Sequence, residues 1–348
     1  MIMNKFHPLT ITSINRLTAD AVAISFNVSN NTLFQFEAGQ YITIKKDING
    51  EEVRRAYSIC SMNSEGVTIG VKKVETGRMS SFLTQSVKEG DVLNVMPPSG
   101  NFVIKGDNKH IVGICAGSGV TPIIAMIKTE LAKPSDAKFT LIYGNKTKDS
   151  SMFAEELHQL QINNSDRLKI HNAYSREGVA GAINGRLDKN TIQQLLNTFM
   201  SLKTADAYFI CGPGELIDNT NELLLLNNIN QKKINFERFT TVEKTDVTDN
   251  VSNEIVSNVL VSVDGEDFEF TLSNKGQTIL DAAMEQGADV PFSCKGAVCC
   301  TCKARVMEGK VTMDANYSLS EEEVADGFIL GCQARPVSAN VVVDFDEI

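Results

Sequence analysis

The stretch Cys294-Lys-Gly-Ala-Val-Cys-Cys-Thr-Cys302, followed after 29 intervening residues by Cys332, decides the fold of the C-terminal part of the chain. Cys-x4-Cys-x2-Cys with one distant cysteine is the plant-type spacing for a 2Fe–2S cluster. Such a loop wraps three thiolates around one end of a small inorganic cluster, and Gly296 supplies the backbone freedom that this requires. We therefore predict that the cluster ligands are Cys294, Cys299, Cys302 and Cys332.

Structural zinc and disulfides are the other uses of such cysteines. Zinc sites commonly combine two Cys-x2-Cys pairs, or Cys with His, whereas this region has one such pair and no histidine follows His171. The chain begins Met-Ile-Met-Asn-Lys without an apolar signal stretch, so we expect a reducing, cytoplasmic location in which disulfides are disfavoured. The spacing selects Cys299 rather than its neighbour Cys300, which we interpret as a packed thiol outside the cluster.

Charge is distributed unevenly along the 348 residues. The chain has a net charge of −10, and residues 259–348 carry all of it, with 16 acidic against 6 basic side chains. This sign argues against nucleic-acid binding, and no apolar run reaches the ~18–20 residues that span a membrane. The acidic region is either a solubility feature or a docking face that steers a basic redox partner to the cluster.

The remaining sequence divides into two patterns. Residues 1–106 alternate in the manner of strands at 22–28, 40–44 and 67–71, with a hairpin signal at Asn49-Gly50, which predicts a small antiparallel barrel. Residues 107–239 alternate strands and helices, which predicts a doubly wound α/β domain with a parallel sheet. The expected strands are 111–116, 139–143, 169–174 and 207–211, and the expected helices are 122–132, 151–160, 187–199 and 215–227.

Residues 240–258 are polar and lack a core pattern, so we predict a linker there. The domain at 259–348 then begins with a hairpin over 259–270 whose turn is Asp264-Gly265. It continues with a short helix at 279–286 and ends with a strand at 339–344.

Four short motifs carry the expected chemistry of the first two domains. They are Arg55-Ala-Tyr-Ser58, the segment Val74–Ser81 with its glycine and hydroxyls, Pro97-Pro-Ser-Gly-Asn-Phe102, and Gly117-Ser-Gly-Val-Thr-Pro122. The last motif joins a buried strand to a helix. Its glycines let backbone approach a phosphate, and the helix N-terminus favours an anion.

With these motifs the chain resembles the ferredoxin–NADP reductase superfamily, and specifically members with a C-terminal plant-type ferredoxin domain, over essentially its whole length. The doubled cysteine and Glu237-Arg-Phe239 are similar to the subgroup of reductase subunits that serve phenylacetyl-CoA epoxidases. The resemblance implies a β-grasp fold for the C-terminal domain.

The resemblance also implies roles for individual residues. Arg55 pairs with the FAD pyrophosphate, Tyr57 stacks on the isoalloxazine, and Ser58 hydrogen-bonds near flavin N5. The FAD diphosphate lies on residues 77–80, with Gly77 and Ser80 as contacts. The remaining implied contacts are Gly117, Gly119 and Thr121 on the pyridine-nucleotide pyrophosphate, Cys211 and Glu237 at the nicotinamide, and Phe239 over the other flavin face. For Cys211 a buried structural thiol is the alternative.

The nucleotide is predicted to be NADPH rather than NADH. An NAD site usually has an acidic residue about 20 residues beyond the glycines, whereas here that stretch reads Tyr143-Gly-Asn-Lys-Thr-Lys148. Ser175-Arg176 follows the next strand and offers donors suited to a 2′-phosphate. The resemblance adds that a Ser-Arg pair there binds this phosphate.

We therefore expect an oxidoreductase that passes electrons from NADPH through FAD and the 2Fe–2S cluster to a separate protein. The subgroup resemblance implies the diiron oxygenase of phenylacetyl-CoA epoxidation as that acceptor. The alternative is a reductase that serves a different acceptor: another oxygenase, a hydroxylase, a desaturase or a hybrid cluster protein. A non-catalytic electron-transfer or redox-sensing module and a zinc-stabilised binding protein are further alternatives.

Overall fold

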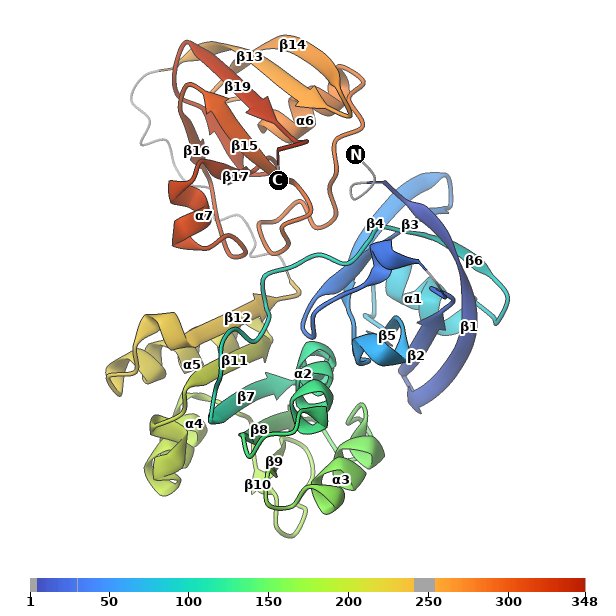
Figure 1. The fold of residues 1–348 in the computed structure, drawn as a ribbon, viewed down its shortest axis with the longest axis vertical. Coiled ribbons are helices and arrows are strands. Elements are labelled where there is room, and N and C mark those ends of the chain that lie inside the picture. Colours follow the sequence, from blue (N-terminus) through green and yellow to red (C-terminus); the bar gives the residue numbers. More distant parts are fainter. Residues whose placement is uncertain (1–4, 30, 241–253, 348) are drawn as a thin grey trace.

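A computed structural model of the chain describes residues 5–29, 31–240 and 254–347. Three units follow one another along the sequence, and the C-terminal one (orange to red) lies above the junction of the other two (Figure 1). This is the predicted three-domain architecture. In the described part of the chain we find no helix with the length and apolar character needed to cross a bilayer.

The N-terminal unit is an antiparallel barrel. Its strands follow the order β4-β3-β6-β1-β2-β5, and a bridge between Ile59 and Ile69 joins the two ends of that order. Asn49 and Gly50, both at positive φ, turn the chain between β3 and β4, as the hairpin signal predicts. The strands are β1 (His7–Thr18), β2 (Ala21–Phe26), β3 (Tyr41–Ile48), β4 (Glu51–Ser58), β5 (Thr68–Lys72) and β6 (Val92–Val95).

One helix in this unit is absent from the sequence prediction. Helix α1 (Arg78–Gln85) begins inside the Val74–Ser81 segment and buries Met79 and Leu83 against the barrel. Met79, Phe82 and Leu83 do have helical spacing, but the helix is only eight residues long, and a pattern this short is hard to separate from the strand-like sequence around it.

The middle unit is a parallel sheet in the order β10-β9-β8-β7-β11-β12, with helices around it (Figure 1). Its four predicted strands and four predicted helices are present within a few residues of their expected bounds, and β10 and β12 are additional. The strands are β7 (His110–Ala116), β8 (Lys138–Asn145), β9 (Leu168–Tyr174), β10 (Ile183–Asn184), β11 (Ala207–Gly212) and β12 (Ile234–Arg238). The helices are α2 (Val120–Ala132), α3 (Ala154–Asn163), α4 (Lys189–Thr198) and α5 (Gly214–Leu226).

The C-terminal unit is a mixed five-stranded sheet in the order β14-β13-β19-β15-β17, with a two-stranded ribbon of β16 and β18. Its core includes Cys302 and Cys332 among apolar side chains. The elements are β13 (Val256–Val263), β14 (Glu266–Ser273), α6 (Ile279–Glu285), β15 (Lys303–Glu308), β16 (Val311–Met313), α7 (Glu321–Ala325), β17 (Phe328–Leu330), β18 (Ala334–Pro336) and β19 (Asn340–Asp344).

The predicted linker at 240–258 falls mostly on residues 241–253, which lie outside the described residues. Strand β13 begins at Val256, three residues inside the predicted linker. Val256 is largely exposed, so the burial alternation that marks a strand begins only with the next residues.

Candidate functional site

The first two units meet at a hydrogen bond between Ser58 and Glu237. Ser58 ends β4 of the barrel, and its Oγ donates to Glu237 Oε2 on β12 at 3.0 Å. The two residues lie 179 positions apart, and the structure brings them together at the place where the resemblance puts flavin N5 and the nicotinamide.

Burial dominates the electrostatics of this pair. Desolvation raises the pKa of Glu237 to about 8, and the hydrogen bond from Ser58 opposes that rise. At pH 7 the carboxyl is therefore mostly protonated. It is able to donate one hydrogen bond while it accepts another.

The other residues of the Arg55–Ser58 motif face different surroundings. Arg55 is exposed, and its Nη1 donates to the carbonyl of Arg54 at 2.7 Å, which leaves its remaining donors for a ligand. Tyr57 is half-buried, and burial raises the pKa of its hydroxyl. A neutral ring with one face partly accessible fits the predicted stacking role.

The predicted diphosphate segment forms the start of helix α1. Gly77 is its N-cap residue, and a Cβ at this position would lie 2.4 Å from Ser80 Oγ. The Ser80 hydroxyl donates to the Gly77 carbonyl at 3.1 Å and accepts from the Val74 amide at 3.1 Å. Ser80 therefore shapes the turn, and the free backbone N–H groups at the helix start remain the donors suited to a phosphate.

The glycines of the Gly117–Pro122 loop have different roles. Gly117 has a φ of +57°, and nothing lies near a Cβ added to it. A Cβ on Gly119 would lie 2.2 Å from the Cys211 carbonyl oxygen, so this glycine allows the helix start to pack against β11. Thr121 is buried, and its hydroxyl donates to the Ser118 carbonyl at 3.0 Å, so it stabilises the loop.

A pocket of about 480 Å³ lies at the carboxyl ends of these parallel strands. Gly117, Ser175 and Phe239 line it. The other predicted nucleotide contacts Gly119, Thr121 and Arg176 do not line it, and all these roles stay predictions. The sequence reasoning missed Lys146 and Arg186, which also line the pocket. Phe239 is 40% exposed, an uncovered aromatic face that a flavin or nicotinamide ring could cover.

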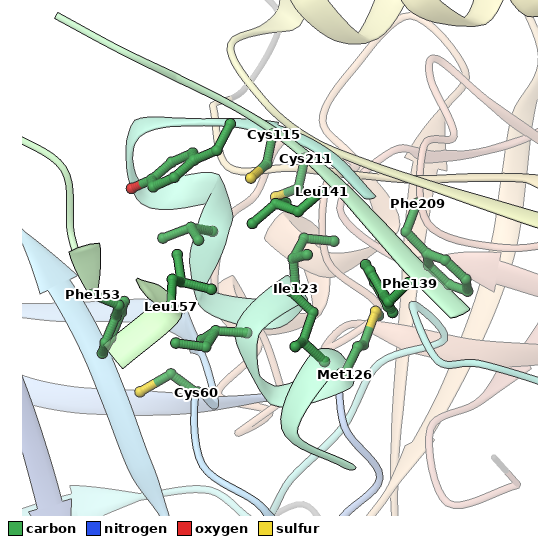
Figure 2. Close-up of a cluster of buried hydrophobic side chains, with 14 of the residues drawn as sticks. Cys60, Cys115, Ile123, Met126, Phe139, Leu141, Phe153, Leu157, Phe209 and Cys211 are labelled. Carbon is green, nitrogen blue, oxygen red and sulfur yellow. The ribbon is translucent and has the colours of Figure 1, made fainter. Parts of the chain in front are cut away.

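Cys211 lies in the apolar core. It is fully buried and pairs in register with Cys115 on β7 and Glu237 on β12. Figure 2 shows its sulfur beside that of Cys115, above Leu141 and Ile123. Burial, and then Glu237, raise the pKa of the Cys211 thiol well above its usual value, so it remains protonated. Its predicted place at the nicotinamide stays a prediction.

The four predicted cluster ligands come together in the C-terminal unit. Cys299 Sγ donates to Cys294 Sγ at 3.2 Å, and bonds from Cys299 and Cys332 lower the pKa of Cys294. Cys299, Cys302 and Cys332 are buried, and Cys294 is half-buried. Within the described ranges no group of three or more His, Cys, Asp or Glu side chains is arranged for a single metal ion. Four thiols in an apolar setting are the donor set of a 2Fe–2S cluster.

The backbone of this loop differs from expectation. Left-handed conformation falls on Lys295 (φ +51°) and Ala297 (φ +63°), the residues that flank Gly296. The Gly296 amide donates to Cys294 Sγ at 3.3 Å. The tight turn is therefore made by its neighbours, while Gly296 supplies a donor to the sulfur.

The cluster loop also touches the barrel. Tyr41 Oη accepts a hydrogen bond from the Cys300 amide at 3.0 Å and lies 3.4 Å from Cys300 Sγ. A second pocket lies beside this contact, and both Glu237 and Cys299 line it. The residues around the Ser58–Glu237 pair and the cluster loop therefore face one another across one cavity. The sequence marks Tyr41 only as part of an alternating strand.

Comparisons with known families account for all three units. Residues 8–104 match the oxidoreductase FAD-binding domain, residues 114–222 the oxidoreductase NAD-binding domain, and residues 261–337 the 2Fe–2S iron–sulfur cluster binding domain. The chain thus has domains for FAD, a pyridine nucleotide and a 2Fe–2S cluster, which confirms the predicted cofactor classes.

Whole-chain relatives agree with this domain order. The chain is 39% identical to one of the subunits of the 1,2-phenylacetyl-CoA epoxidase of Escherichia coli, over 99% of both sequences. It is 31% identical to the ferredoxin reductase component of 3-ketosteroid-9-alpha-monooxygenase of Rhodococcus rhodochrous, over 97% of this chain and 96% of the relative. In fold it is similar to phthalate dioxygenase reductase (TM-score 0.60, 24% identity), over 97% and 98% of the two chains.

Proposed function

Since the chain belongs to the ferredoxin–NADP reductase superfamily, among oxygenase reductases with a C-terminal 2Fe–2S domain, we propose that it is the NADPH-dependent reductase of a phenylacetyl-CoA epoxidase. Bound FAD supplies the conversion of a two-electron hydride into single electrons, which the 2Fe–2S cluster relays to the oxygenase. The protein's own residues bind and orient these groups.

The observation that carries this proposal is the pocket shared by Glu237 and Cys299. Glu237 is bonded to Ser58 at the predicted hydride-transfer site, and Cys299 is a predicted cluster ligand. An electron relay needs its two sites close together, because electron transfer falls off steeply with distance. One cavity lined by both sites satisfies that need.

We assign roles to the barrel residues as follows. Arg55 binds the FAD pyrophosphate, which also lies on the backbone N–H groups of the first turn of α1, directly after Gly77. Ser80 stabilises that turn. Tyr57 stacks on the flavin. Ser58 and the protonated Glu237 orient the groups between which the hydride moves.

Residues of the middle unit hold NADPH and cover the flavin. Gly117 presents its backbone to the pyrophosphate, while Gly119 and Thr121 keep that loop in place. Ser175 and Arg176 bind the 2′-phosphate, and Phe239 covers the second flavin face.

The acceptor assignment rests on the relative that shares 39% identity over the whole chain and on the acidic C-terminal unit. Acidic side chains around the cluster domain attract a basic surface and speed the encounter with it. We propose that the oxygenase docks on this unit in the cytoplasm.

A reconstituted assay tests the proposal. The holoprotein is mixed with the oxygenase subunits of a phenylacetyl-CoA epoxidase and with phenylacetyl-CoA, and NADPH consumption is followed with product formation. We expect NADPH oxidation to depend on both oxygenase and substrate. If NADPH oxidation reduces ferricyanide but never the oxygenase, the chain serves another acceptor.

A further inference from the structure

The feature that carries a further inference is the contact between Tyr41 of the barrel and Cys300 of the cluster loop. Three short contacts meet at the Tyr41 hydroxyl: the Cys300 amide at 3.0 Å, Cys300 Sγ at 3.4 Å and Thr301 Oγ1 at 3.3 Å. All three belong to the segment between the predicted ligands Cys299 and Cys302.

Tyr41 is held rigidly from the barrel side. Its amide donates to the Ser99 carbonyl and its carbonyl accepts from the Ser99 amide, both at 2.9 Å. In the neighbouring strand it pairs in register with Ser58. Tyr41 therefore lies between the two sites: its backbone is opposite Ser58, and its hydroxyl contacts the cluster loop.

The turn beneath Tyr41 is shaped to receive its ring. Gly100 has a φ of +120°, and a Cβ there would lie 3.0 Å from two ring atoms of Tyr41. Any other residue would be strained and would crowd the ring. The Pro97–Phe102 motif therefore forms the turn against which the Tyr41 ring packs. The ring is 5% exposed.

Further contacts join the C-terminal unit to the barrel. Asn101 Nδ2 donates to both carboxylate oxygens of Glu323, at 3.0 and 2.9 Å, and Glu323 also pairs with Lys303 at 3.4 Å. On the other side, Arg54 stacks on Phe292 at 4.1 Å and lies 3.4 Å from Asp289. Arg54 is buried, but Asp289 and Asn101 are exposed, so the polar contacts that these two make contribute little and the docking is reversible.

We propose that Tyr41 is a positioning residue that docks the cluster loop on the flavin barrel, and that Cys300 serves this contact and is not a cluster ligand. Docking would hold bound FAD and the 2Fe–2S cluster close enough for one electron to move from the reduced flavin to the oxidised cluster. Tyr41 itself gains and loses neither electron nor proton. This inference rests on the proposed electron relay and adds the residue that sets the distance between its two centres.

The test is Tyr41→Phe in the holoprotein, which removes the hydroxyl and keeps the ring. Anaerobic stopped-flow mixing with NADPH separates flavin reduction from cluster reduction. We expect flavin reduction at the wild-type rate and cluster reduction roughly three- to tenfold slower. Loss of one or two hydrogen bonds lowers the population of the docked state by about that factor. The matched control is Tyr208→Phe, which removes a buried hydroxyl bonded to the Leu202 carbonyl, away from this contact. We expect both of its phases to be unchanged.

A structural readout accompanies the kinetics. Amide hydrogen exchange in residues 299–303 and 97–101 should speed up in Tyr41→Phe and stay unchanged in Tyr208→Phe. Unchanged exchange with an unchanged cluster rate would overturn the inference, and so would equal slowing of both kinetic phases. If the wild-type protein shows no NADPH-dependent flavin reduction, the proposed function fails and not the docking role.

A second variant decides the outcome if Tyr41→Phe loads less iron and sulfide than wild type. Asn101→Asp lies outside the cluster loop and sets a carboxylate against Glu323. We expect the same selective slowing of cluster reduction. A wild-type rate in this variant would overturn the docking role.

Discussion

Ser58 of the barrel and Glu237 of the nucleotide-binding unit lie 3.0 Å apart, donor oxygen to acceptor oxygen, although 179 positions separate them in sequence. The bond joins the first two domains at the proposed site of hydride transfer. The third domain meets the same site through the cavity that Glu237 and Cys299 line. The function of the chain follows from this meeting of three domains.

The buried Glu237 carboxyl predicts a dependence of stability on pH. Burial raises its pKa from 4.5 to about 8 in the folded chain, so the folded state keeps a proton that the unfolded state releases. The stability that this proton contributes is present below pH 4.5 and is lost as pH rises through 8. Glu237→Gln cannot ionise, so its melting temperature relative to wild type should rise by several degrees between pH 5 and 8.

The control for that experiment is Glu75→Gln, which changes an exposed carboxyl of the barrel. Its difference from wild type should stay flat over the same pH range. Parallel melting curves for Glu237→Gln and wild type would show that Glu237 titrates normally in the folded protein.

Arg176 should distinguish NADPH from NADH. Arg176→Ala removes one charge-assisted hydrogen bond to the 2′-phosphate, worth at least about 1.5 kcal/mol, so the KM for NADPH should rise roughly tenfold. The KM for NADH should not change. Lys232→Ala, which removes an exposed cation beyond α5, is the control and should affect neither nucleotide. An equal change with both nucleotides would remove Arg176 from the 2′-phosphate site.

Gly119 should tolerate no side chain. Gly119→Ala places a Cβ 2.2 Å from the Cys211 carbonyl oxygen, and such overpacking costs about 1–3 kcal/mol. We expect a melting temperature several degrees lower. Gly178→Ala is the matched control, because the nearest atom to its added Cβ is 4.0 Å away. Equal melting temperatures for the two variants would contradict the close packing of α2 on β11.

Local patterns were enough to predict most of the fold. The alternation of strands and helices from His110 onward, the Asn49-Gly50 turn and the cysteine spacing each depend on neighbours in sequence, and the structure agrees with them. Helix α1 escaped prediction because its apolar spacing, at Met79, Phe82 and Leu83, extends over only eight residues inside a region of strand-like sequence.

The site was predictable only in part. The sequence marked Ser58 and Glu237 by resemblance, but not that a hydrogen bond joins them. Tyr41 could not be found, because its partner Cys300 lies 259 positions away and its strand looks ordinary. The phosphate contact of Gly119 stays a prediction, and its close packing against the Cys211 carbonyl was not predicted. Contacts between domains produce no periodic pattern in the sequence.

Removal of one predicted cluster ligand tests the electron order most directly. The measurement compares Cys302→Ser with wild type for NADPH-dependent reduction of ferricyanide and of the oxygenase. Cys60→Ser, a buried thiol that bonds the Thr68 carbonyl, serves as the control and should leave both rates unchanged. We expect Cys302→Ser to keep ferricyanide reduction, which proceeds through the flavin, and to lose reduction of the oxygenase. Loss of both activities, or survival of both, would contradict a relay that runs from flavin to cluster to partner.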